Sequence, residues 1–299
     1  MNLRGKAVVV TGAGQGIGKA YARAILDEGG SVVANDIDDD LLAQLAEEWA
    51  VDSDRLVTHR ADITDWTAAE GLIAASTASF GRLDGLVNNA GVYDVRRADE
   101  NDAAVIRLQV DVNVLGTMYC GIHAMRSMLK QQGGSIINTT SGAMVGLPLR
   151  GIYSATKAAV AALTWSWAQD LQGTNVRVNA ISPLARTRQL DVAAAYLQVD
   201  HDQLMRNIPP EANAPIITYL LSDAADDIRG QIVRISDDLL TLIHKPDVVR
   251  PGVHLPASTI EAVGEAFDEE LRHHLEPVGA PNWSPVGGQT TVTAKATAR

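Results

Sequence analysis

The chain has 299 residues, enough for one large α/β domain or two small ones with a sizeable core, and its formal net charge of −11 argues against nucleic acid or an anionic membrane as a partner. A single cysteine, Cys120, excludes an internal disulfide and fits a reducing compartment. The sequence shows no signal peptide and no apolar stretch near the roughly 18 residues of a membrane span, so we expect a cytoplasmic protein.

The first predicted element is an apolar strand over residues 7–10, which leads through a glycine-rich turn into an alanine-rich helix. Four glycines lie within seven positions of this turn, at Gly12, Gly14, Gly16 and Gly18. Glycine suits such a turn because other residues resist its backbone angles and because backbone N–H groups must approach a ligand closely. The positive end of the following helix predicts a site for an anion, typically a pyrophosphate; an ordinary strand-to-helix turn is the alternative.

An acidic residue, Asp36, closes the second predicted strand, residues 31–35. Such a carboxylate can accept hydrogen bonds from both ribose hydroxyls of a dinucleotide, and it repels a 2′-phosphate. Asp36 could instead be an acid at the amino end of a helix, since Asp38, Asp39 and Asp40 follow at once. We expect the ribose role, and therefore NAD as the cofactor, because Asp36 lies at the end of the strand.

Two more predicted strands end in polar residues. The third, residues 55–60, leads to Asp62 and Ile63, where the aspartate could also be a plain turn residue. The fourth, residues 83–87, ends in Asn88-Asn89-Ala90-Gly91. Side-chain amides there can brace the adjoining loops while the small residues leave room for a ligand, although such a sequence could also form a simple turn.

A long helical region runs from about Ala103 to Gln132 and contains Asn113. Asparagine disfavours a helix interior because its side chain competes for backbone hydrogen bonds. Asn113 therefore predicts either a kink or a functional role.

The next elements place a serine ahead of a tyrosine–lysine pair. Residues 135–140 predict a fifth strand that leads to Ser141. The helix that follows contains Tyr153 and, one turn later, Lys157, so both side chains project from one face. With two more strands, at 175–181 and 231–235, the alternation predicts a doubly wound α/β Rossmann fold, a parallel sheet of about seven strands with helices on both faces.

Four features in this order resemble the short-chain dehydrogenase/reductase family: T-G-x-x-x-G-x-G over residues 11–18, Asn88 to Gly91, Ser141, and the pair of Tyr153 and Lys157. The resemblance covers about residues 3–237 and implies an NAD-dependent oxidoreductase without a metal. It implies that Asp62 faces the adenine and that Thr187 meets the nicotinamide carboxamide. The cofactor site that it implies consists of Gly12, Gln15, Gly16, Ile17, Gly18, Asp36, Asp62, Ile63, Asn88, Asn89, Tyr153, Lys157 and Thr187.

The resemblance also implies catalytic roles for Asn113, Ser141, Tyr153 and Lys157. Tyr153 would exchange a proton with the substrate oxygen, which Ser141 would hydrogen-bond. Lys157 would bind the nicotinamide ribose, and Asn113 would connect the pair to water. A free tyrosine, with a pKa of about 10, is a poor base at neutral pH. We expect the Lys157 ammonium and the positive nicotinamide to favour the phenolate and so to lower that pKa.

The sequence departs from the family at two places. Ser141 precedes Tyr153 by 12 residues, one fewer than is usual, so counting back from the tyrosine points to Thr140 instead. Counting forward along the strand from Gly134 points to Ser141, and we expect Ser141 because a loop absorbs a deletion more easily than a strand. Leu184 stands where the family usually has glycine, so the shape of that loop can differ.

The expected reaction interconverts a secondary alcohol and its ketone. Apolar residues favour an apolar substrate that is terpenoid, steroid-like or cyclic. Those expected to line the pocket are Met144, Val145, Leu147 and Leu149, together with Leu190, Tyr196 and Leu197 from a substrate flap over residues 188–207. Residues 183–188 weakly resemble the hydroxyacyl dehydrogenases of β-oxidation, so a 3-hydroxyacyl thioester is an alternative substrate. A catalytically silent NAD-binding regulatory protein is an alternative of another class, against which the intact catalytic residues argue.

We assign residues 1–244 to one Rossmann domain and residues 245–299 to a proline-rich C-terminal extension. Within the extension, an amphipathic helix is predicted near residues 258–275 because five large apolar side chains recur at helical spacing. They are Ile260, Val263, Phe267, Leu271 and Leu275. Because their burial is favourable, we expect this helix to pack over the substrate entrance or across a subunit contact of a homodimer or homotetramer.

Overall fold

The structure, a computed structural model, describes residues 3–185, 194–198, 208–236, 239–246, 252–255 and 259–275. These residues form one sheet whose eight strands are β1 (Ala7–Thr11), β2 (Ser31–Asp36), β3 (Leu56–Arg60), β4 (Gly85–Asn88), β5 (Gly134–Thr139), β6 (Val176–Ser182), β7 (Ile232–Ser236) and β8 (Leu239–Ile243). The helices are α1 (Gly16–Asp27), α2 (Asp39–Glu48), α3 (Trp66–Phe80), α4 (Ala103–Val110), α5 (Thr117–Lys130), α6 (Gly151–Asp170), α9 (Ala214–Leu221) and α10 (Ile260–Glu269).

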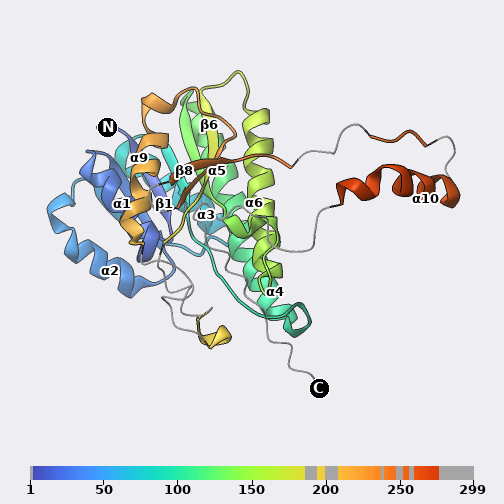
Figure 1. Ribbon diagram of the computed structural model, residues 1–299. Helices are drawn as coiled ribbons and strands as arrows, with labels where there is room; N and C mark the ends of the chain where they lie inside the picture. The colour runs from blue at the N-terminus through green and yellow to red at the C-terminus, as the bar shows by residue number, and fades with distance from the viewer. Residues whose placement is uncertain are drawn as a thin grey trace.

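The strand order is β3-β2-β1-β4-β5-β6-β7-β8, and neighbouring strands are parallel except for the antiparallel pair β7–β8 (Figure 1). This arrangement confirms the predicted doubly wound α/β fold. The sequence analysis missed β8, whose residues Leu239 to Ile243 pair back along β7. The pairing covers the backbone groups of β7 that would otherwise form a free edge of the sheet.

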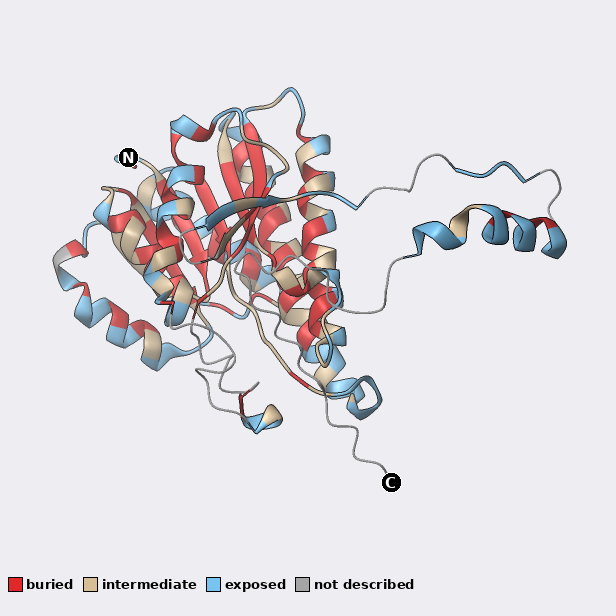
Figure 2. Cartoon of the chain, viewed as in Figure 1, coloured by how far each residue is buried: buried red, intermediate tan, exposed pale blue. Residues whose placement is uncertain are grey.

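Successive residues of β1 point to opposite faces of the sheet, and this alternation divides the core in two. Val8 and Val10 pack with residues of α1 and α9, whereas Val9 packs with residues of α3, α5 and α6. Figure 2 shows the central strands buried along their length between the two helical layers. Because both faces are covered, these strands are continuously apolar, as the sequence predicted for a parallel sheet.

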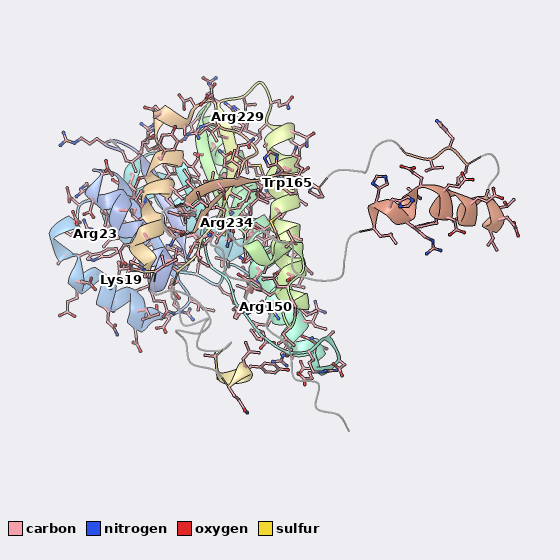
Figure 3. The ribbon with its side chains drawn as sticks, viewed as in Figure 1. Lys19, Arg23, Arg150, Trp165, Arg229 and Arg234 are labelled. Atoms are coloured by element: carbon pink, nitrogen blue, oxygen red, sulfur yellow. The ribbon has the colours of Figure 1, made fainter. Side chains whose placement is uncertain are left out.

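Contacts around Trp49 hold α2 beside α1. The Arg23 guanidinium of α1 lies 5.2 Å from the centre of the Trp49 ring, and its Nη1 is 2.8 Å from Asp52 Oδ2. Lys19, one turn earlier on α1, lies 5.8 Å from the same ring; Figure 3 labels both cations. These contacts fix the helix that follows the end of β2, where Asp36 lies.

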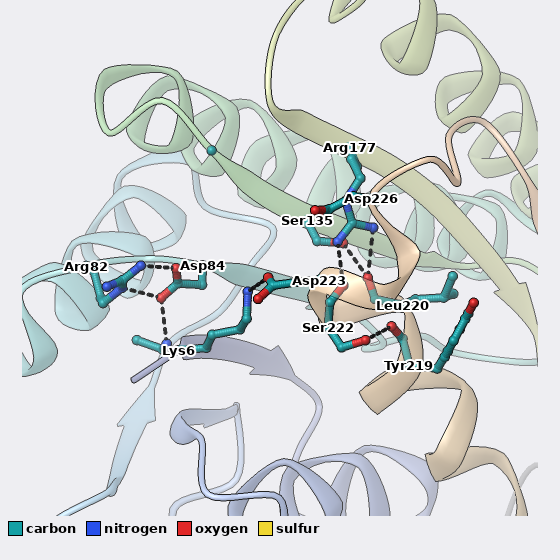
Figure 4. A network of polar contacts seen from close by, with 12 residues as sticks. Lys6, Arg82, Asp84, Ser135, Arg177, Tyr219, Leu220, Ser222, Asp223 and Asp226 are labelled. Atoms are coloured by element: carbon teal, nitrogen blue, oxygen red, sulfur yellow. Dashed lines mark hydrogen bonds and ion pairs between the residues drawn. The ribbon is translucent and has the colours of Figure 1, made fainter. Parts of the chain in front are cut away.

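Polar contacts close the sheet at the amino ends of its strands (Figure 4). Asp84, just before β4, accepts a hydrogen bond of 2.8 Å from the backbone N–H of Ala7 at the start of β1. Arg177, near the start of β6, donates to the carbonyl oxygens of Leu220 and Ser222 at the end of α9. The opposite, carboxyl ends of the strands are left to form a cleft.

The helix α10 lies inside the range in which the sequence predicts a helix, but it stands away from the sheet and its flanking helices (Figure 1). Its large apolar side chains, Ile260, Val263 and Phe267, are exposed, with Ile260 87% exposed, whereas Ala262 and Ala266 are buried. The helix therefore does not cover the substrate entrance of its own chain, and contact with a second subunit stays a prediction. None of the helices in the described part of the chain has the length and the apolar run that crossing a membrane requires.

Candidate active site

One cleft of about 1130 Å³ opens at the carboxyl ends of the central strands. Its lining residues come from the segments after β1, β2, β3, β4, β5 and β6 and from the beginning of α6. The cleft includes the place between β1 and β4 where the strand order reverses, which is where doubly wound sheets bind ligands. Single small-molecule sites occupy roughly 300–1,000 Å³, so this cleft can hold a dinucleotide and a substrate together.

The glycine-rich turn forms one wall of the cleft and requires glycine either for its backbone angles or for its close contacts. Gly12 and Gly16 have φ values of +62° and +57°, in the left-handed region that favours glycine. A Cβ on Gly18 would lie 2.0 Å from the carbonyl oxygen of Gly12. The first turn of α1, from Gly16 to Gly18, lines the cleft, and its N–H groups have no acceptors within the helix. The turn therefore fits a pyrophosphate, as predicted.

Asp36 lies in the cleft beside this turn. Its Oδ2 accepts a hydrogen bond of 3.0 Å from the Gly14 N–H, and its Oδ1 accepts one of 2.9 Å from the Ile37 N–H. The alternative role, capping the next helix, belongs to Asp38, whose Oδ1 accepts from the N–H groups of Asp40 and Leu41. The Asp36 carboxylate is thus held at the cleft by the backbone rather than used within α2.

The two asparagines after β4 have different surroundings. The Asn89 amide donates to the carbonyl oxygens of Thr11 and Gly12, at 3.0 and 3.2 Å, and so braces the glycine-rich turn. Asn88 points into the protein, where its amide donates to Asn138 Oδ1 and to the Thr117 carbonyl. Asn88 does not line the cleft, so its predicted contact with a cofactor is corrected to a structural one. Neighbouring residues of a strand face opposite sides, which separates the two amides.

Asp62 and Ile63 line the cleft after β3. The Asp62 carboxylate accepts hydrogen bonds from the backbone N–H and the hydroxyl of Thr64, at 2.9 and 2.8 Å, so it is a turn residue that also faces the cleft. The Gln15 side chain, ahead of α1, lies in the same wall. Thr187, predicted to meet the nicotinamide, lies outside the described residues.

Asn113 lies fully buried in a π-helical turn, Asp111–Gly116, that interrupts the helical region between α4 and α5. Its Oδ1 accepts from the Val92 N–H at 2.8 Å, and its Nδ2 donates to the Val92 carbonyl and to Thr156 Oγ1. The widened turn accommodates this side chain, which joins the segment after β4 to α6. Turns of this kind are frequent at functional sites. The structure thus shows the predicted break in the helix at Asn113.

Ser141, Tyr153 and Lys157 meet at the far wall of the cleft. Ser141 follows β5, and its hydroxyl lies close enough to that of Tyr153 to lower the tyrosine pKa. Lys157, one turn later on α6, is 4% exposed and donates from Nζ to the Thr139 carbonyl at 2.7 Å. Its Nζ lies 5.7 Å from the centre of the Tyr153 ring. The three side chains therefore form one buried cluster that opens onto the cleft.

The structure also separates Ser141 from Thr140. The Thr140 hydroxyl donates to the Lys157 carbonyl at 2.8 Å, and the residue is 1% exposed. That hydrogen bond uses its only proton to fix β5 against α6. Of the two candidate hydroxyls, the one that affects the pKa of Tyr153 belongs to Ser141.

Burial dominates the electrostatics of this cluster. It raises the pKa of Tyr153 to about 12, a rise that the hydrogen bond with Ser141 opposes. Burial likewise lowers the pKa of Lys157 to about 8. In the chain without cofactor, desolvation disfavours the charged form of both groups and outweighs any effect of Lys157 on the tyrosine. The expected lowering of the tyrosine pKa by Lys157 together with the nicotinamide stays a prediction.

The pocket wall differs from the predicted one. Leu147 lines the cleft as predicted, but Met144 packs with buried residues of α6 and β6, and Val145 is exposed. Leu190 lies outside the described residues. Among the described lining residues that the sequence analysis missed are Tyr93, Leu108, Val112, Ala143 and Arg150.

The remaining predicted wall residues also lie elsewhere. Leu149 and Leu197 are not among the lining residues. The Tyr196 hydroxyl donates to Glu100 Oε2 at 2.6 Å, on the α4 side of the molecule. The missed residues come from segments separated in sequence, so no local pattern could have identified them.

Comparisons with known proteins agree with this geometry. The family model of the short chain dehydrogenases matches residues 6–190. The 3-oxoacyl-(acyl-carrier-protein) reductase of Thermotoga maritima is 33% identical over 80% of this chain and its own full length. The cis-4-hydroxycyclohexanecarboxylate dehydrogenase of Sinomonas cyclohexanicum is 35% identical over 77% of this chain and 94% of its own. A crystal structure of NAD⁺-bound xylitol dehydrogenase superposes with a TM-score of 0.73 at 26% identity, covering 79% of this chain and 99% of the other.

Proposed function

The chain belongs to the short-chain dehydrogenase family of oxidoreductases, and we propose that it interconverts a secondary alcohol and its ketone with NAD as the cofactor. The observation that carries the proposal is that Ser141, Tyr153 and Lys157 line the same cleft as the glycine-rich turn, with Lys157 one turn after Tyr153 on α6.

The preference for NAD is inferred from Asp36. A carboxylate held at the cleft by the Gly14 and Ile37 N–H groups can accept hydrogen bonds from ribose hydroxyls. The same charge disfavours a 2′-phosphate. The xylitol dehydrogenase that superposes on this chain was crystallised with NAD⁺, which supports but does not by itself decide the choice.

In the proposed reaction, the residues of this chain handle the substrate oxygen and its proton. When bound, the nicotinamide accepts or returns the hydride and, in its oxidised form, adds a positive charge. Ser141 donates a hydrogen bond to the substrate oxygen and stabilises its developing negative charge. Tyr153 takes the hydroxyl proton during oxidation and gives it back to the carbonyl oxygen during reduction.

The pKa values place a requirement on this mechanism. Because burial raises the pKa of Tyr153 to about 12, the phenolate needs a positive charge close to it. Lys157 alone is not sufficient: its pKa of about 8 leaves it mostly charged at neutral pH, yet the pKa of Tyr153 still lies at about 12. We infer that the oxidised cofactor contributes part of that charge, so that proton removal becomes favourable only in the ternary complex.

A panel of cyclic and linear secondary alcohols, incubated with NAD⁺ and in parallel with NADP⁺, tests the proposal by NADH or NADPH absorbance. We expect turnover with NAD⁺, and loss of turnover in Tyr153→Phe with NADH affinity retained. Binding of NADH without turnover of any alcohol or ketone would instead support an NAD-binding protein without catalytic activity.

A 3-hydroxyacyl thioester is the second candidate substrate. The relative from Thermotoga maritima, named as a 3-oxoacyl reductase and covered over its full length, favours it. Reduction of acetoacetyl-coenzyme A and of cyclohexanone by NADH, compared at equal concentrations, separates the two candidates. Preference for the thioester would overturn the cyclic alcohol.

A further inference from the structure

The substrate end of the cleft carries a positive charge that the proposed mechanism does not use. Of the described residues that line the cleft, Lys157 and Arg150 are cationic, and Lys157 belongs to the catalytic cluster. The acidic lining residues, Asp36 and Asp62, lie after β2 and β3, at the opposite end of the cleft from α6. Arg150 therefore faces a cavity without a carboxylate of the described chain on its side.

Arg150 immediately precedes α6, and Figure 3 labels it there. Its Nε donates to the Tyr93 hydroxyl at 2.6 Å and its Nη1 to the Pro148 carbonyl at 3.2 Å. Both acceptors are neutral, and among the described residues Arg150 forms no ion pair. The nearest acidic residue along the Tyr93 segment, Asp94, is bound in two places by Arg96. The guanidinium thus keeps its charge and its Nη2 donors for another partner.

Tyr93 connects Arg150 to the reacting centre. The Tyr93 and Tyr153 rings meet edge to face, with their centres 4.8 Å apart. The Tyr93 hydroxyl accepts from Arg150 and so keeps its own proton to donate. An anion next to Arg150 would receive hydrogen bonds from both side chains, while the remainder of the same molecule reaches Tyr153 and Ser141.

The backbone before Arg150 supports a fixed position of Arg150 relative to Tyr93. Leu149 has a φ of +64°, in the left-handed region that residues with a Cβ adopt only with strain. The Arg96 N–H donates to the Leu149 carbonyl at 2.8 Å, which ties the segment of Tyr93 to that of Arg150. Two segments 57 residues apart are therefore joined where the two donors meet.

We propose that the substrate is an anionic alcohol or ketone, a molecule whose carboxylate binds Arg150 and Tyr93 while its carbinol or carbonyl group meets Ser141 and Tyr153. This inference rests on the proposed function and replaces the purely apolar substrate that the sequence predicted. Leu108, Val112 and Leu147 then contact the apolar part between the two ends. An arginine orients a carboxylate strongly because its donors form a rigid fork.

A binding experiment tests the anion site independently of turnover. The NADH complex is titrated by calorimetry with cyclohexanecarboxylate and with the neutral cyclohexanecarboxamide. Hydrogen bonds to charged groups correspond to a difference of about 10- to 100-fold, so we expect the carboxylate to bind that much more tightly. Arg150→Met should abolish the difference, and Tyr93→Phe should reduce it. Arg97→Met, which removes an exposed cation paired with Asp99 outside the cleft, is the matched control and should leave it unchanged. Equal binding of the two compounds to the unaltered protein would overturn the inference.

Turnover of 4-hydroxycyclohexanecarboxylate and of its methyl ester separates this inference from the proposed function. We expect Arg150→Met to raise KM for the acid by about 10- to 100-fold and to leave KM for the ester unchanged. An equal loss of kcat with both compounds would show that Arg150 acts only through Tyr153 and would overturn the inference. Turnover of neutral alcohols with no advantage for the acid would also overturn it, yet leave the proposed function intact. Arginine-dependent carboxylate binding without turnover of any alcohol would support the anion site and contradict the proposed function.

Discussion

The backbone N–H of Gly14 donates a hydrogen bond of 3.0 Å to Asp36, so the glycine-rich turn and the end of β2 are held together by the carboxylate that we propose binds the ribose. The contact is close, because a Cβ on Gly14 would lie 2.8 Å from Asp36 Oδ2. Asp36 consequently has a structural and a proposed recognition role, which a charge-neutral variant can separate.

Asp36→Asn keeps an oxygen for the Gly14 N–H and removes the negative charge. We expect NAD⁺ to bind about 10-fold more weakly, since hydrogen bonds to charged groups contribute about 1.5–3 kcal/mol, and NADP⁺ to bind more tightly because the repulsion is gone. Quenching of the fluorescence of the five tryptophans measures both affinities. Asp38→Asn, which affects the cap of α2, is the control. An unchanged ratio of the two affinities would contradict the assignment.

Ser141→Ala should mainly lower the activity, whereas Thr140→Val should mainly lower the stability. Loss of the Ser141 hydroxyl removes the proposed donor to the substrate oxygen, so we expect kcat to fall about 10²-fold with little change in Tm. Loss of the Thr140 hydroxyl removes its bond to the Lys157 carbonyl and should lower the free energy of unfolding by about 1–3 kcal/mol. Steady-state kinetics and urea denaturation of both variants provide the measurements. A larger fall of kcat in Thr140→Val would show that the threonine holds the substrate oxygen.

Lys157 should make the stability of the fold depend on pH in a defined direction. Burial lowers its pKa from the ordinary value of 10.5 to about 8, so between these values the unfolded chain binds more protons than the folded one. The free energy of unfolding then rises with pH in that window, because the cost of burying the ammonium disappears as the folded chain releases its proton.

Relative to Lys157→Met, the unaltered protein should therefore gain roughly 2–3 kcal/mol of stability between about pH 7 and pH 10. Urea denaturation of both proteins across this range gives the difference and cancels the titration of other groups. A difference that stays constant, or that falls with pH, would show that Lys157 is not held charged against its burial.

Removal of the residues after His244 should leave the Rossmann domain folded and able to bind NADH, and should change its assembly or its KM. The helix α10 stands apart from the sheet, so we expect an unchanged Tm and unchanged NADH affinity. We expect a smaller oligomer or a raised KM, because the exposed Val263 and Phe267 side chains gain by burial against a second subunit, including the substrate entrance of that subunit. Sedimentation and steady-state kinetics test this, and Phe267→Glu in the full chain should have the same effect. Unchanged assembly and kinetics in both proteins would show the extension to be passive.

The sequence by itself determined the order of the elements from β1 to β7 and many of the polar residues around the cleft. Alternating strand and helix patterns specify a doubly wound sheet, because each pattern dictates which face an element buries. The glycines after β1 and the pair of Tyr153 and Lys157 could also be located, because the geometry of both features is local. The glycine-rich turn depends on the φ angles of its own residues, and the tyrosine and lysine lie one helical turn apart on the same helix.

Only the tertiary structure decided what each of several neighbouring polar groups contacts. Thr140 and Ser141 both line the cleft, but the Thr140 hydroxyl is bound to the Lys157 carbonyl, whereas that of Ser141 lies beside Tyr153. Asn88 is turned away from the cleft while Asn89 braces the glycine-rich turn, because neighbouring residues of a strand face opposite sides.

The tertiary structure also decided the charge of the site. Arg150 and Tyr93 are brought together by the packing of the segment after β4 against the beginning of α6, and no pattern along the chain encodes a contact across 57 residues. The pKa values of Tyr153 and Lys157 likewise follow from how deeply the two groups are buried. The composition and spacing of the sequence identify the titratable side chains. How far these side chains are removed from water, which determines their charge, depends on the folded structure.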